Sequence, residues 1–233
     1  MVDSDLAIRK ETIPITPTGR GHEEPMAQGD IEIPRAKLVQ PTSDEATLKN
    51  SEERVELGKI INSITKEVLP ELFIPVFRYV NWIRWNPRNK KDQNFDPAFD
   101  PGALIFETKN ANDPRVLEGE KFGPNGEPPA VTKYLNFFSY FPGHSMPVVV
   151  SFAKTSFAAG QRLNSLTLFN GGDMFSMQYK LRSVEREAEG TKFFVYDVAP
   201  GGKPSKKDFD MAENFWSTFR GKTIKAHQDS PEN

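Results

Sequence analysis

Residues 77–85 read Phe-Arg-Tyr-Val-Asn-Trp-Ile-Arg-Trp, so that aromatic and apolar side chains are interleaved with arginine. In a β-strand, successive side chains point to opposite faces, and Trp82 would then lie between Arg78 and Arg84 on one face. Bases stack on flat rings and phosphates are attracted to cations, so this face suits single-stranded nucleic acid. A core strand with one solvated face has the same pattern, and both interpretations stay open.

A second aromatic strand is predicted at residues 131–141, where Tyr134, Phe138 and Tyr140 follow Lys133. Three further cations, Arg88, Lys90 and Lys91, lie just after the first of these strands. The candidate nucleic-acid-binding residues are therefore Arg78, Trp82, Arg84, Arg88, Lys90, Lys91, Lys133, Tyr134, Phe138 and Tyr140. Which face of each strand is exposed depends on the register of pairing, because a shift of one residue exchanges the two faces.

The residues that usually carry catalysis are sparse. The chain has no cysteine and three histidines, and no histidine lies in a zinc-protease or triad-like motif. His144 precedes Ser145, but the surrounding Pro-Gly sequence is typical of a solvated turn. No phosphate-binding glycine loop and no dinucleotide fingerprint is present. We therefore predict a non-enzyme without a catalytic residue or a cofactor.

Three aspartates recur every four residues, at Asp92, Asp96 and Asp100. On a helix they would share a face and could hold a divalent cation. Pro97 and Pro101 interrupt any such helix. The prediction is a solvated acidic loop and no metal site.

The composition indicates one core with extensions. The chain has 233 residues, of which 37% are hydrophobic and 19 are proline, and its formal net charge is -2. This charge argues against a general polyanion binder but leaves room for a local basic groove. No apolar run approaches the length of a membrane span, so no membrane partner is expected.

Four regions are predicted from composition and periodicity. Residues 1–30 read as a flexible arm, 31–200 as a β-rich domain with a long Pro-rich insertion at 86–130, 201–221 as an amphipathic helix, and 222–233 as a polar tail. Ser205 begins a capping-box-like sequence for that helix.

The order of elements favours a mainly β fold. A helix that starts at Thr155 or Ser156 separates the earlier strands from a final hairpin. The predicted strands are 31–40, 58–65, 67–86, 131–141, 147–154, 174–185 and 191–199. An antiparallel OB-like barrel with one inserted helix fits this order. Pro70 and Pro75 require an edge, a bulge or a break near the start of the long strand.

Several segments resemble a family of tailed-bacteriophage proteins. They are Ile33-Pro34 with Leu38-Val39-Gln40-Pro41-Thr42-Ser43, then Gly58 with Ile61–Val68, and Pro147–Ser156 with Leu163 and Leu166. The similarity covers most of residues 31–200. It implies an OB-fold single-stranded DNA-binding protein of phage replication or recombination. Some relatives carry cysteines in the segment that matches the long loop, whereas this chain has none there, so a metal knuckle is not expected.

Together these features predict sequence-tolerant binding of single-stranded DNA by aromatic stacking and phosphate contacts. The expected location is the cytoplasm of an infected bacterial host. Other phage replication or recombination proteins and further copies of the chain are candidate partners. The alternative is a β-rich phage structural or assembly protein whose arm and loop contact neighbouring subunits.

Overall fold

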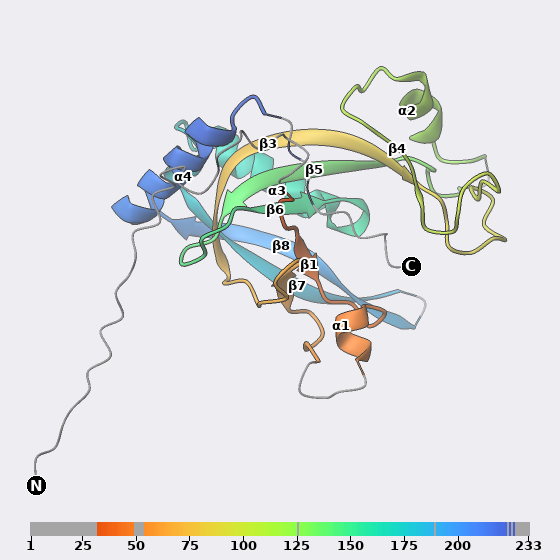
Figure 1. Cartoon of the computed structure of the whole chain (residues 1–233), viewed down its shortest axis with the longest axis horizontal. Helices are drawn as coiled ribbons and strands as arrows, with labels where there is room; N and C mark the ends of the chain where they lie inside the picture. Colours follow the sequence, from red (N-terminus) through yellow and green to blue (C-terminus); the bar gives the residue numbers. More distant parts are fainter. Residues whose placement is uncertain are drawn as a thin grey trace, which may run out of the picture.

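The computed structural model describes residues 32–48, 54–124, 126–188, 190–222, 224 and 226. Its longest strand, β3 (Leu72–Trp85), lies at the centre of a six-stranded antiparallel sheet. The sheet order is β6-β5-β3-β7-β8, with β4 also paired to β3 (Figure 1). The other strands are β4 (Leu104–Thr108), β5 (Thr132–Tyr140), β6 (Val148–Phe152), β7 (Gln178–Ala188) and β8 (Thr191–Gly202). The prediction of a mainly β fold is confirmed.

A bulge early in β3 sets which side chains share a face. The pairing with β5 shifts between Pro75 and Phe77, as the prediction from the prolines required. Proline has no N–H to donate to the ladder, so it is accommodated at a bulge. Beyond the bulge, Phe77 and Tyr79 pack on one side of the sheet, whereas Val80 and Trp82 pack on the other.

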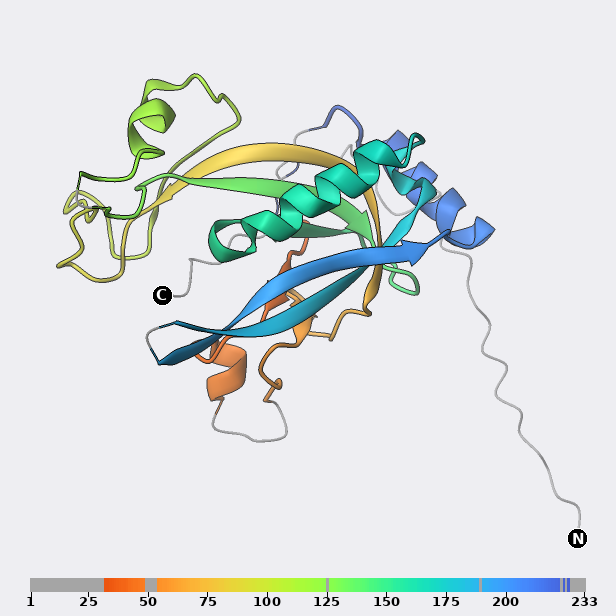
Figure 2. The same cartoon turned by 180° about the vertical axis from the view of Figure 1, so that it is seen from behind.

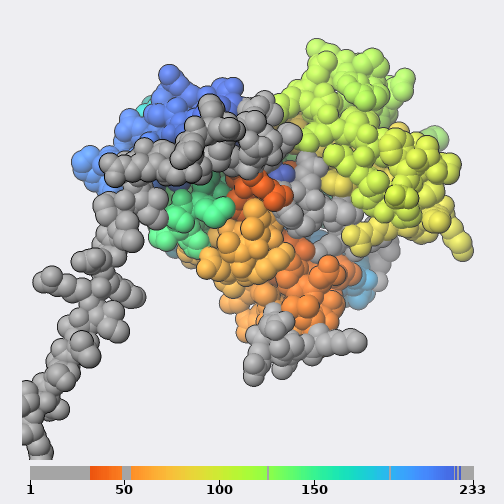
Figure 3. Space-filling model, in the orientation of Figure 1, coloured from red at the N-terminus to blue at the C-terminus, as the bar shows by residue number. Residues whose placement is uncertain are grey.

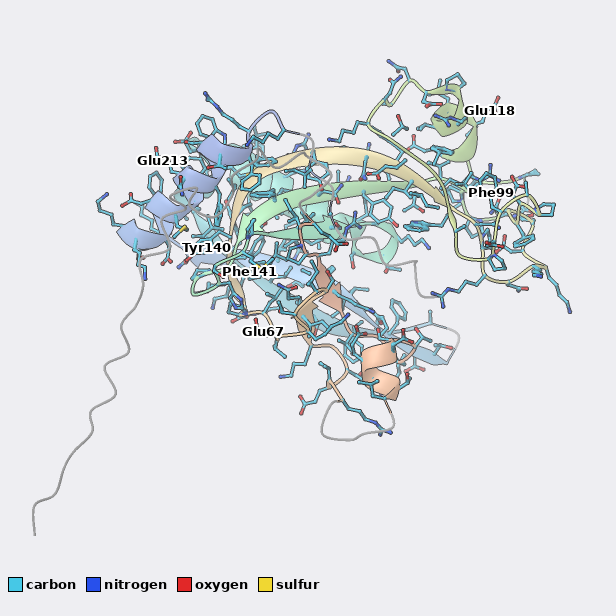
Figure 4. All side chains as sticks on the ribbon, in the orientation of Figure 1. Glu67, Phe99, Glu118, Tyr140, Phe141 and Glu213 are labelled. Carbon is cyan, nitrogen blue, oxygen red and sulfur yellow. The ribbon has the colours of Figure 1, made fainter. Side chains whose placement is uncertain are left out.

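Two apolar clusters lie on opposite sides of β5. One lies beneath α3 (Phe157–Phe169), which crosses the sheet in Figure 2, and includes Phe137 and Leu163. The second lies beneath α4 (Lys206–Phe219) and includes Phe138. Tyr140 and Phe141, labelled in Figure 4, belong to different clusters although they are adjacent in sequence.

The predicted C-terminal helix is confirmed as α4. The Ser205 hydroxyl accepts a hydrogen bond from the Asp208 backbone N–H at 3.2 Å, which caps the helix. Ala212 is fully buried, and Phe209, Trp216 and Phe219 pack against the second cluster. This apolar face therefore covers the sheet core.

The expectation of a barrel is wrong, because the large sheet does not close. β1 (Ala36–Leu38) pairs with β2 (Ile60–Asn62) in a separate two-stranded sheet. A single bridge between Arg35 and Val149 links the first segment to β6. The helix α3 contacts both β6 and β8 and so occupies the space between the outer strands.

The insertion at 86–130 forms a folded lobe with two elements that were not predicted from the sequence. It contains β4 and α2 (Pro114–Gly119), the latter capped by Asp113. Buried Asn86 donates hydrogen bonds to the carbonyl oxygens of Asp96, Phe99 and Asp100 at 2.8–3.1 Å. The lobe stands at the right of Figure 3, and Figure 4 labels Phe99 and Glu118 within it.

The predicted arm at residues 1–30 lies outside the described residues, as does most of the tail at 222–233. Within the tail, Ala226 forms a parallel bridge with Ile33 and Ile224 is buried in the second cluster. In the described part of the chain, no helix is both long and apolar enough to cross a membrane.

Candidate functional site

The structure places seven of the ten predicted binding residues on two opposite faces of the sheet and the other three in the segment after β3. Trp82 pairs with Lys133, and the lysine Nζ lies 5.4 Å from the centre of the indole ring. Tyr134, Phe138 and Tyr140 lie on the opposite face, where Phe138 and Tyr140 pack against α4. Because Lys133 and Tyr134 are consecutive in β5, they point away from each other. The ten residues therefore do not form one surface.

Three of the four predicted stacking rings are buried. Trp82 is 7% exposed, Tyr140 4% and Phe138 0%. The Trp82 ring packs against Val116 of α2, and its Nε1 donates a hydrogen bond to Glu120 Oε1 at 2.5 Å. These rings have the role of core residues in this structure, since a base cannot reach a buried face.

The predicted cations, by contrast, are mostly accessible. Arg88, Lys90 and Lys91 are exposed in the segment after β3, and Lys133 is exposed on β5. Arg84 is half-buried. Arg78 is also exposed, and its Nη1 donates a hydrogen bond to Asn164 Oδ1 on α3 at 2.9 Å.

A groove of about 570 Å³ opens between the lobe and the end of the β7–β8 hairpin. Its walls come from five segments that are distant in sequence. They are 40–42, 85–94, 128–132, 154–155 and 191–194, with gaps in the second and third. Figures 1 and 2 show the hairpin and the lobe projecting in the same direction from the sheet.

The groove combines aromatic rings with positive charge. Trp85 and Phe193 are half-buried and line it, together with the exposed side chains of Arg88 and Lys154. Lys192 also lines the groove and forms an ion pair with Glu185, with Nζ 2.7 Å from Oε1. Rings and cations in one groove are what single-stranded nucleic acid requires.

Arg88 is the predicted site residue that this groove contains, whereas Trp85, Lys154 and Phe193 were not predicted for the site. Trp85 lies three residues after Trp82, on the opposite face of β3. No local pattern could have grouped Lys154 with Phe193, because only the packing of the hairpin beside α3 brings them together.

Two half-buried tyrosines on this side of the sheet, Tyr134 and Tyr79, are neutral. Burial raises the pKa of Tyr134, whose hydroxyl is hydrogen-bonded to the Trp85 side chain. Burial also raises the pKa of Tyr79 to about 12, although Arg35 opposes the shift. The contact with Tyr134 helps to orient the Trp85 indole at the groove.

The face towards α4 also carries a row of hydrogen-bonded polar side chains. Ser151 donates to Asn136 Oδ1 at 2.7 Å, and Asn136 Nδ2 donates to Asn81 Oδ1 at 2.6 Å. Asn81 in turn donates to Glu107 on β4. Buried polar groups that pair with one another stabilise a sheet and leave no free site.

The model of the Pam3 phage gp34-like protein family matches residues 12–225 of the chain. The chain belongs to this family. The resemblance to phage proteins is therefore confirmed, and this member of the gp34-like family is a bacteriophage-related protein. No curated protein and no solved structure matched the chain.

Among the described residues of this gp34-like protein, no group of three or more histidine, aspartate or glutamate side chains could hold a metal ion. Asp92 lines the groove, whereas Asp96 and Asp100 contribute their backbone carbonyls to Asn86. That the protein is not an enzyme stays a prediction.

Proposed function

We propose that this gp34-like protein binds single-stranded DNA without strong sequence preference, in phage DNA replication or recombination. The observation that carries the proposal is the groove in which Trp85 and Phe193 lie with Arg88 and Lys154. The phage family supports the setting. The site differs from the one that the strand pattern predicts, because Trp82 is buried.

In the proposed mechanism, bases stack on Trp85 and Phe193 while phosphates contact Arg88 and Lys154. Stacking on an aromatic side chain contributes about 1–3 kcal/mol per base and tolerates any base, because every base has a π-face. Phosphate contacts release counterions, so affinity falls as the salt concentration rises. No chemical step is needed, in keeping with the prediction of a non-enzyme.

Tryptophan fluorescence during titration with oligo-dT tests the proposal. The chain has three tryptophans, and Trp85 lines the groove. We expect quenching at low salt in the wild type, and its loss in Trp85→Phe. Trp216→Phe is the control, because Trp216 lies on α4, packs against the second cluster and should not report on the groove. A folded protein that shows no quenching at low salt would contradict the proposal.

A charge-removal variant tests the phosphate contacts. Arg88→Ala combined with Lys154→Ala should weaken binding at least tenfold and reduce its salt dependence, because two phosphate contacts are lost. Lys207→Ala removes a charge from the exposed side of α4 and is the matched control. Equal affinity of all three proteins would exclude this groove as the binding site.

The alternative, a structural or assembly role, is favoured by one observation. Leu168 and Phe169 at the end of α3 are 74% and 83% exposed. Adjacent exposed apolar side chains are typical of interaction sites. Light scattering with and without oligo-dT separates the two functions, because a large assembly that forms without DNA would favour this role.

A further inference from the structure

The free edge of the outer strand β8 is hydrogen-bonded by the side chain of Gln40. Among the described strands it pairs only with β7, so its other edge presents backbone N–H and C=O groups that need partners. At Phe194, both groups bond the side chain of one residue. Gln40 Nε2 donates to Phe194 O at 2.8 Å, and Phe194 N donates to Gln40 Oε1 at 2.9 Å.

The Gln40 amide therefore takes the place of a peptide group from a neighbouring strand. Two residues along the same edge, Tyr196 N donates to the Ser156 hydroxyl at 3.1 Å. Residues i and i+2 of a strand direct their backbone groups to the same side. The side chains of Gln40 and Ser156 thus hydrogen-bond backbone groups of β8 that a further strand would pair with if the sheet continued.

The ring of Phe194 fits against the same N-terminal unit. Gly58 has a φ of +76°, and a Cβ at this position would lie 2.7 Å from Phe194 Cε1. Gly58 N also donates a hydrogen bond to Val39 O at 2.9 Å, beside Gln40. The hairpin is therefore held to the β1–β2 unit by a ring contact, by the two hydrogen bonds between Gln40 and Phe194, and by the Tyr196 hydroxyl, which donates to Ala36 O at 2.8 Å.

Gln40 and Phe194 both line the groove, and the hairpin beyond Phe194 forms one of its walls. We infer that Gln40 is a positioning residue, which holds the β7–β8 hairpin at the distance from the lobe that the groove needs to bind its ligand. The inference rests on the proposed function for the identity of that ligand, which is single-stranded DNA. Gln40 need not contact the DNA.

Distance measurements across the groove test the positioning role directly. The chain has no cysteine, so Gln93→Cys and Glu187→Cys, both at exposed positions, can carry spin labels on the lobe and the hairpin. We expect a narrow distance distribution in the parent protein and a broader one after Gln40→Ala. Gln178→Ala is the matched control, since Gln178 Nε2 also donates to a β8 carbonyl, that of Gly201, outside the groove.

The affinity for oligo-dT is the second measurement. Gln40→Ala should weaken binding about five- to tenfold, because the loss of two hydrogen bonds lets the β7–β8 hairpin move relative to the lobe. Gln40→Glu retains the size of the side chain but cannot donate to Phe194 O, so it should also weaken the affinity for oligo-dT. This second variant keeps the test valid if Gln40→Ala folds poorly. Gln178→Ala should bind as the parent does.

An unchanged distance distribution in both Gln40 variants would overturn the inference, and so would a broader distribution with unchanged affinity. If the parent protein does not bind oligo-dT, the proposed function fails, while the distance distributions still decide whether Gln40 holds the hairpin.

Discussion

At the scale of single residues, burial separates two tryptophans that the sequence pattern treats alike. Trp82 and Trp85 lie three residues apart on β3, so they point to opposite faces of the strand. Trp82 is enclosed by the lobe and hydrogen-bonded to Glu120. Trp85 lines the groove. The same residue type therefore has a structural role at one position and a proposed binding role at the other.

Replacing Trp82 should affect stability more than binding. Trp82→Ala should lower the free energy of unfolding by about 3–5 kcal/mol, because it removes a large buried side chain. Urea denaturation measures this loss. Trp82→Phe should retain most of the parent's oligo-dT affinity, unlike Trp85→Ala, which removes a proposed stacking ring. A large loss of affinity in a fully folded Trp82→Phe protein would show that Trp82 does take part in binding.

At the scale of elements, close packing overrides local propensity in α3. Gly160 lies within the helix, where alanine would be favoured by about 1 kcal/mol. A Cβ at this position would lie 2.6 Å from Phe152 Cβ on β6. The glycine is therefore needed for the helix to approach the sheet.

Gly160→Ala should accordingly destabilise the protein by about 1–3 kcal/mol, since overpacking outweighs the gain in helix propensity. Gln161→Gly, at an exposed position next to Gly160 in the same helix, should cost less than about 1 kcal/mol through propensity alone. Chemical denaturation of both variants compares the two effects. A stabilising Gly160→Ala would show that α3 can move away from Phe152.

The β1–α1–β2 unit is linked by a buried carboxylate. Glu45 on α1 (Asp44–Thr47) forms ion pairs with Lys37 and Lys66, each at 2.9 Å. Burial alone would raise the pKa of Glu45, but the hydrogen bonds from Lys66 and Lys37 outweigh this and lower the pKa to about 2. The ionised carboxylate therefore stabilises the folded state.

This stabilisation should depend on pH. It is fully present above the ordinary glutamate pKa of 4.5 and is lost as the pH falls from 4.5 towards 2. Glu45→Gln should destabilise the protein by about 1–3 kcal/mol at pH 7 and reduce the pH dependence of unfolding in that range. Thermal unfolding between pH 7 and pH 3 provides the measurement. Parallel profiles for the two proteins would contradict the assignment.

At the scale of the whole molecule, charge is balanced overall but distributed locally. The chain has 30 basic and 32 acidic residues. Long-range attraction of a polyanion is therefore weak, and binding must depend on the few cations beside the groove. The open sheet allows these cations to line one groove, because the hairpin and the lobe extend from the sheet on either side of it.

The salt dependence of oligo-dT binding should consequently be shallow. With two or three phosphates contacted, the plot of log affinity against log salt concentration should have a slope of about −1.4 to −2.1. Titrations at several salt concentrations give this slope. A value several times steeper would show that many more cations participate, and that the groove is only part of a longer binding surface.

The sequence alone determined the mainly β class, an irregularity near the start of β3, the α3 and α4 helices and the phage resemblance. These follow from local periodicity, proline chemistry and family-specific segments, which can be read along the chain. The folded lobe could not be predicted, because contacts between residues distant in sequence hold it together, such as the bonds from buried Asn86 to carbonyls 10 to 14 residues away.

Only the tertiary structure decided which aromatic residues are accessible. Strand alternation assigns side chains to two faces, but it does not say that α4 covers one face or that α2 encloses Trp82. The candidate groove likewise joins Arg88 to Lys154 and Phe193 from distant segments. Burial and proximity between distant segments are properties of the packed chain, so the site emerges only once the hairpin, the helix and the lobe are in place.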